Sequence, residues 1–120
     1  MTYAELKTVI SGIGLPYAYY QFPNKTEQEP PFICFFFTGS DDLFADDKNY
    51  APIRPLAIEL YTDNKDFETE KLVEDALATA GLAYSRDETW LDAEHMNMVV
   101  YTTEVVVTVA TSTSTTEVLK

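Results

Sequence analysis

The residues best suited to bind a metal lie in one acidic loop. Four aspartates, Asp41, Asp42, Asp46 and Asp47, fall close together in the sequence. Clustered carboxylates supply the oxygen ligands that Ca²⁺ prefers. The loop lacks the alternate spacing, the central glycine and the closing glutamate of an EF-hand. We therefore expect a solvated loop without a metal ion.

Two large apolar residues, Leu43 and Phe44, sit in the middle of this acidic loop. They are hard to bury within the loop itself, so they either anchor a partner or fold back onto the domain's own core. The sequence leaves both readings open. The candidate partner interface comprises Asp41, Asp42, Leu43, Phe44, Asp46 and Asp47.

No other group of residues predicts catalysis or cofactor binding. His95 is the single histidine and has no neighbouring Cys or His, so a zinc site would need distant carboxylates. Cys34 is the single cysteine, which excludes an intrachain disulfide and favours a small buried hydrophobe. The sequence has no Gly-x-Ser-x-Gly motif, and the glycines at 12 and 14 end a helix. We expect no enzyme activity, cofactor or metal.

The net charge and hydrophobic content of the chain limit the kinds of partner that it can bind. The chain has 120 residues and a formal net charge of −12, with 46% hydrophobic residues, so we expect one folded domain. Such acidity opposes binding to nucleic acid and favours either a basic partner or simple solubility. Neither a signal peptide nor a membrane span is expected, which predicts synthesis in the cytoplasm.

The centre of the predicted fold is a pair of apolar strands, Phe32–Phe37 and Tyr50–Tyr61, on either side of the acidic loop. In the second strand Leu56, Ile58 and Leu60 alternate with outward residues and should face the core. Pro52 and Pro55 place the start of this strand at an edge or outside the sheet. The first strand is apolar on both faces, so it should be covered twice or meet another subunit.

A helix is predicted over about 64–80, capped by Asp63 or Asn64 and ended by Gly81. Its expected buried stripe is Phe67, Val73, Leu77 and Ala80, flanked by Leu72 and Ala76. Its acids, Glu68, Glu70, Glu74 and Asp75, are expected mostly on the solvent side.

The remaining elements complete an α+β fold. A capping box at Thr2 and Glu5 begins a first helix, whose apolar face is Leu6, Val9, Ile10 and Ile13. Further strands are predicted at 17–22, at 83–91 and, after a turn at 92–95, at 96–109. The order is α-β-β-β-α-β-β, a mixed, mainly antiparallel sheet with two helices on one face. Residues 1–109 form the domain, and the Thr/Ser-rich arm 110–120 should be flexible unless a partner strand receives it.

Several stretches together resemble a known class of protein. They are Thr2-Tyr3-Ala4-Glu5-Leu6, Pro31 to Phe37, Phe44-Ala45-Asp46, Ile58 to Asp63, Lys71 to Glu74 and the Val-rich last strand. In their order along the chain and their residue types they resemble the tail terminator, or tail-to-head joining, proteins of long-tailed phages and of prophages of Gram-positive bacteria. The likeness covers about residues 2–109.

The resemblance implies a structural role in the virion. It implies a homo-oligomer, a hexameric ring that caps the tail tube and joins it to the head-connector protein. No catalytic or cofactor residue is carried over. Two alternatives stay open: another small head-tail connector or minor tail protein, or an acidic monomeric module that binds a basic protein.

Overall fold

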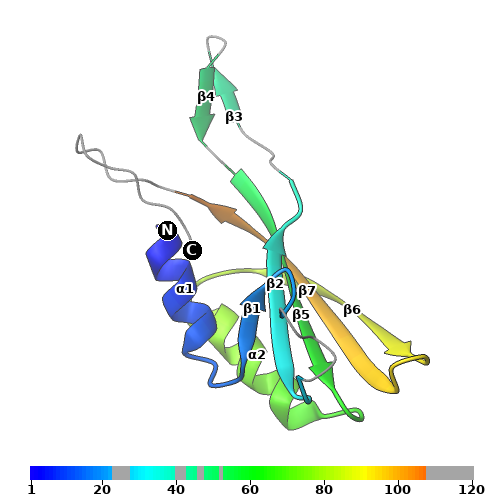
Figure 1. Ribbon diagram of the computed structural model, residues 1–120. Helices are drawn as coiled ribbons and strands as arrows, with labels where there is room; N and C mark the ends of the chain where they lie inside the picture. The colour runs from blue at the N-terminus through cyan, green and yellow to red at the C-terminus, as the bar shows by residue number, and fades with distance from the viewer. Residues whose placement is uncertain (23–27, 40–42, 46–47, 52, 108–120) are drawn as a thin grey trace.

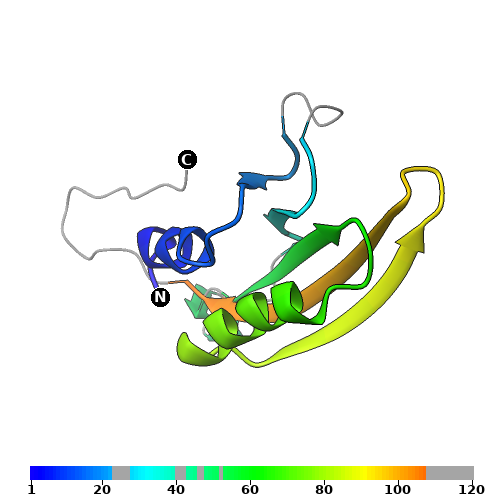
Figure 2. The same cartoon turned by 90° about the horizontal axis from the view of Figure 1, so that it is seen from below.

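The computed structural model describes residues 1–22, 28–39, 43–45, 48–51 and 53–107, with only the backbone described at 43–45 and 48–51. Within these ranges, a five-stranded sheet in the order β1-β2-β5-β7-β6 carries two helices on one face (Figure 1; Figure 2). Only β1 and β2 pair in parallel. The elements are α1 (Tyr3–Ser11), β1 (Tyr17–Tyr19), β2 (Phe32–Phe37), β3 (Leu43–Ala45), β4 (Lys48–Ala51), β5 (Ile53–Thr62), α2 (Phe67–Thr79), β6 (Tyr84–Leu91) and β7 (Met96–Val106). The predicted fold class and element order are confirmed.

The hairpin β3–β4 is an addition to the predicted order. It forms a separate two-stranded sheet that stands beyond the end of the main sheet (Figure 1). The single strand predicted over Tyr50–Tyr61 is therefore wrong in its first part, since β4 and β5 are separate strands. Pro52, which lies outside the described residues, stands between them in the sequence, and proline cannot donate to a ladder.

The core lies between the helices and the middle strands. Alternate residues of β5 and β7 face it, as predicted, and adjacent strands bring Ile58 beside Tyr101 and Leu60 beside Val99. Burying each large aliphatic side chain contributes about 1.5–3 kcal/mol. The fully buried side chains are Leu6, Ile10, Ile33, Leu56, Ile58, Leu60, Val73, Leu77, Val99, Tyr101 and Val105.

Strand ends follow local backbone chemistry. β1 stops at Tyr19, short of the predicted Phe22, because Tyr20 adopts a left-handed φ of 71°. Ile53–Pro55 pair with β7 alone, since β2 joins β5 only from Leu56 onward, so the start of β5 does lie at an edge. The last strand ends at Val106, and the predicted residues 108–109, like the arm 110–120, lie outside the described residues.

The helix ends are largely as predicted. The amide of Glu5 donates to Thr2 Oγ1 at 3.1 Å and the amide of Thr2 donates to Glu5 Oε1 at 2.7 Å, which confirms the capping box. Gly81, with φ of 76°, ends α2 as predicted, in a Schellman motif in which the amide of Leu82 donates to the carbonyl of Leu77 at 2.9 Å.

The predicted start of α2 is wrong. Asp66, rather than Asp63 or Asn64, is the N-cap, and its carboxylate accepts from the amide of Thr69 at 3.0 Å. The hydroxyl of Thr62 instead donates to the carbonyl of Asn64 at 2.7 Å, so the chain turns there before the helix begins. These two bonds fix the boundary.

The predicted buried stripe of α2 is also partly wrong. Val73 and Leu77 are buried, but Phe67 is 73% exposed and Leu72 is 48% exposed. Glu70, predicted to face solvent, is only 3% exposed and occupies the stripe at helical spacing from Val73 and Leu77. A carboxylate is tolerated there because charged groups of neighbouring elements pair with it.

Candidate functional site

The candidate interface predicted from the sequence lies in the hairpin. Leu43 and Phe44 are on β3, and Asp41, Asp42, Asp46 and Asp47 lie outside the described residues. The pairing of β3 with β4 is irregular between Leu43 and Phe44. The backbone of the hairpin stands clear of the main sheet and does not fold back onto it (Figure 1). The two described strands of the hairpin are therefore placed where they can contact another molecule.

The sheet face opposite the helices carries aromatic residues of β2 and their neighbours. Phe32 stacks on Tyr61 with centroids 4.8 Å apart, and Phe22 meets Phe32 edge-on at 5.5 Å. Tyr20 stacks on Phe36 at 5.1 Å. The prediction that β2 is covered on two sides is thus met largely within the chain, by the segment that follows β1 and by β5.

A hollow of about 520 Å³ opens on this face. Its apolar part comes from β2, β5 and the β6–β7 turn, while Tyr20 at the rim is 60% exposed. The Tyr61 hydroxyl donates to Glu59 Oε1 at 2.6 Å, and burial, with Glu59 beside it, raises the pKa of Tyr61, which keeps the phenol protonated. The lining residues are Tyr20, Gln21, Gln28, Phe32, Cys34, Tyr61, Leu91, Glu94 and Met96. The hollow suits an apolar side chain of a partner.

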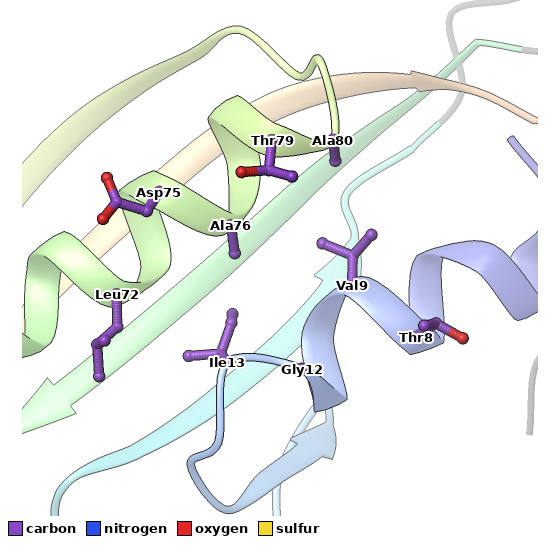
Figure 3. A pocket seen from close by; sticks show the side chains of 9 residues that line it. All are labelled: Thr8, Val9, Gly12, Ile13, Leu72, Asp75, Ala76, Thr79 and Ala80. Carbon is purple, nitrogen blue, oxygen red and sulfur yellow. The ribbon is translucent and has the colours of Figure 1, made fainter.

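A groove of about 490 Å³ separates the two helices (Figure 3). Val9 and Ile13 line it from the α1 side and Ala76 and Ala80 from α2, while Thr8, Asp75 and Thr79 are polar residues of its wall. Gly12 lets the chain pass closely here, because an added Cβ would lie 3.1 Å from the carbonyl oxygen of Thr8. Aliphatic side chains, Leu72 among them, make up most of the groove, and its lining has no cluster of reactive groups.

A charged network joins α2 to β6 on the helix side of the sheet. Arg86 Nη2 and Lys65 Nζ both donate to Glu70 Oε1, at 2.7 Å and 3.0 Å. Lys65 Nζ also lies 2.8 Å from Glu70 Oε2, a buried oxygen that accepts no hydrogen bond. Lys65 also reaches Glu88 Oε1 at 2.8 Å. Asn97 Nδ2 donates to Glu88 Oε2 at 3.2 Å. Each described acid of this network is thus already engaged by a donor.

Titration of the network follows from these contacts. Burial opposes the charge of Lys65, but hydrogen bonds to Glu70 and Glu88 outweigh it and raise the pKa of Lys65. The hydrogen bond from Lys65 lowers the pKa of Glu88. The Tyr101 hydroxyl donates to Glu74 Oε2 at 2.8 Å, and burial raises the pKa of Tyr101. These contacts favour the charged form of Glu88 and the neutral form of Tyr101. We call the ion-paired group Lys65, Glu70, Arg86 and Glu88 the clamp.

The sequence reading of Glu70 and Glu74 as helix-surface charges is wrong. Glu70 is buried and Glu74 is partly buried, because both turn toward β6 and β7. The hollow was also missed, because its residues come from four separate stretches of the chain. Phe67, expected in the buried stripe of α2, is 73% exposed, and Trp90 on β6 is 48% exposed.

The described residues offer little for catalysis. Among them no group of three or more His, Cys, Asp and Glu side chains is arranged to hold a metal ion. His95 lies exposed in the β6–β7 turn with a left-handed φ of 53°. Neither described helix is long and apolar enough to cross a membrane.

The chain matches no known protein-family model, and no curated protein matches its sequence.

Proposed function

We propose that the chain is a structural virion assembly protein of the tail terminator class, made in the bacterial host cell and located at the head-tail interface. It assembles into a ring, a hexamer in the complete particle, that caps the tail tube and meets the head connector. The observation that carries the proposal is the β3–β4 hairpin, which stands beyond the main sheet and pairs with none of its described strands (Figure 1). Such a hairpin is suited to reach a neighbouring virion protein.

A closed ring needs two different patches on each copy, because its contacts run head to tail. The hairpin joins the sheet at the start of β5, whereas the hollow contains Tyr61, near the end of β5. A strand rises about 3.3 Å per residue, so the eight residues from Ile53 to Tyr61 place the two patches roughly 25 Å apart. This separation supports a head-to-tail assembly over a face-to-face dimer.

The charge supports the same role. Each copy carries a formal net charge of −12, and no part of the sequence forms a basic stripe. A ring of such copies repels the phosphate backbone, so that DNA passing from the head would not be held in its lumen.

The proposal is tested in the phage or prophage that encodes the chain. Without the chain, electron microscopy should show heads and tails that remain separate, and wild-type protein should restore complete particles. Phe44→Asp should restore far fewer particles, because a charge replaces an apolar residue of the proposed anchor. Phe67→Asp, which changes an exposed phenylalanine on α2, is the matched control and should rescue well.

Complete particles formed without the chain would contradict the proposed function. Equal rescue by Phe44→Asp and wild type would leave the function standing but remove the hairpin as the anchor. Rings of the purified protein on tail tubes, seen by the same microscopy, would exclude the monomeric binding module.

A further inference from the structure

The free edge of β6 is the longest unprotected edge of the sheet. Among the described strands β6 pairs only with β7, and its register runs over eight consecutive pairs without a bulge. Every residue from Tyr84 to Trp90 is exposed. An edge strand presents alternate N–H and C=O groups that a further strand can bind. The opposite edge, β1, has only three residues.

Several protections of sheet edges are missing from β6. Its sequence, YSRDETWL, contains no Pro, Gly or Lys, although Arg86, Asp87 and Glu88 give it charged side chains. Its charged residues on the helix side are already used, since Arg86 binds Glu70 and Glu88 binds Lys65. The strand is therefore regular and held in place, with a backbone ready to accept a partner.

We propose that residues 108–116 of one copy add as a strand to the β6 edge of a second copy. This inference rests on the proposed function, since it names the contact that links neighbours in the ring. The segment lies outside the described residues, and its sequence is TVATSTSTT. β-Branched residues occupy positions 108, 109, 111, 113, 115 and 116, and the segment has no Pro, Gly or charge. This composition favours a strand with two weakly polar faces.

Charge selects this segment as the occupant. The whole chain carries −12, but residues 108–120 contain only Glu117 and Lys120 and are neutral in sum. The β6 edge carries Arg86, Asp87 and Glu88, a sum of −1. The neutral segment adds no like-charge contact to this edge.

Topology selects a second copy as the source of the segment. β7 has β5 on one side and, up to Thr103, β6 on the other, so a tight reversal after Val106 would find a free side of β7 only along residues 104–106. The end of β7 is also fixed to the body, because the amino terminus donates to the carbonyl of Val106 at 3.1 Å. Reaching the outer edge of its own β6 would require a crossover around that strand.

Length and symmetry agree with this arrangement. At about 3.3 Å per residue, the nine residues 108–116 span roughly 30 Å in extended form, enough to follow all of β6. A contact between the carboxyl-terminal segment of one copy and β6 of the next is head to tail, which can close into a ring. A β6–β6 contact would instead close as a dimer.

The test uses the full-length chain with Ser112→Pro and Thr113→Pro together. Adjacent residues of a strand point their N–H groups in opposite directions, so one of the two prolines must remove a bond to the receiving edge in any register. The matched control is Ser112→Val with Thr113→Val, which keeps the donors and the β preference. Sedimentation gives the mass over a concentration series, and amide hydrogen exchange reports on β6.

At high concentration the wild-type and control chains should exceed 13.6 kDa and protect the alternate amides of residues 84–91 that point away from β7. The proline variant should associate about ten- to a hundredfold more weakly, as expected for the loss of one or two ladder hydrogen bonds, and should leave these outward amides unprotected.

Three results would overturn the inference: a wild-type chain that stays monomeric with an unprotected β6, equal association of the proline variant, or concentration-independent protection that the prolines abolish. The last would mean that the segment binds its own chain. Because these measurements use no virus particle, they fail or succeed independently of the rescue assay for the proposed function.

Discussion

β6 and β7 are neighbours in one sheet, yet their side chains differ in burial. On β7, Asn97, Val99, Tyr101, Thr103 and Val105 are buried at every second position, while β6 is exposed from Tyr84 to Trp90. The two strands pair residue for residue over eight positions. The environment therefore changes across the width of one strand, about 4.8 Å.

The position of α2 explains the change. Val73 and Leu77 of this helix are buried with the core-facing residues of β5 and β7, whereas Glu70 turns to Arg86 on β6. β7 is thus held by apolar burial and β6 by its ladder and by ion pairs. The outer backbone of β6 stays accessible, whereas the backbone of β7 is paired with β5 on one side and β6 on the other.

The largest expected effect on stability comes from replacing one tyrosine by alanine on each of the two strands. Tyr101→Ala on β7 should lower the free energy of unfolding by about 3–5 kcal/mol, because it empties a fully buried site. Tyr84→Ala on β6 should cost about 0.5–1.5 kcal/mol, since Tyr84 is 37% exposed and mainly loses its edge-to-face contact with Tyr101 at 5.4 Å. Urea unfolding measures both, and equal losses would remove the distinction between the strands.

The apolar burial that holds the middle strands of the sheet could be predicted from the sequence. Period-two alternation placed Leu56, Ile58 and Leu60 inward, and the spacing of Thr2 and Glu5 predicted a cap, because both signals depend on residues close together in the chain. The β3–β4 hairpin was predicted only as a loop, since strands of 3 and 4 residues are too short to show a periodic pattern.

The ion pairs that hold β6 to α2 could not be predicted in the same way. Glu70 and Arg86 are 16 residues apart and Lys65 and Glu88 are 23 apart, so their meeting depends on how α2 sits over the sheet. A glutamate at a buried helical position looks the same in sequence as one facing solvent when its partner is on another element. The hollow was missed for the same reason, because β2, β5 and the β6–β7 turn only meet in the fold.

The next effect tests the clamp between α2 and β6. Glu70→Ala should lower the free energy of unfolding by about 1–3 kcal/mol, because hydrogen bonds to a buried charged group are lost. The loss should stay below that of a fully buried pair, since the side chains of Lys65 and Arg86 are 33% and 38% exposed and can turn to water. Glu68→Ala, on the exposed side of α2, is the control, and a similar loss there would show that Glu70 has no special role.

The smallest effect is the pH dependence that Glu88 of the clamp gives to the folding stability. The hydrogen bond from Lys65 lowers the pKa of Glu88 from its usual 4.5, so the folded state binds this proton less readily than the unfolded chain. The stabilisation is therefore complete above the usual pKa and disappears as the pH falls through the lowered one. It should be under about 1 kcal/mol, as for other partly exposed pairs.

Glu88→Gln should remove this contribution at neutral pH and make the melting temperature fall less steeply between about pH 5 and pH 3 than in the wild type. Asp87→Asn is the control, because the neighbouring residue of the strand points to the opposite face of the sheet. If Glu88→Gln and the wild type lose stability in parallel on acidification, Lys65 does not hold Glu88, and β6 is fixed to α2 through the ion pairs of Arg86 with Glu70 and Glu74.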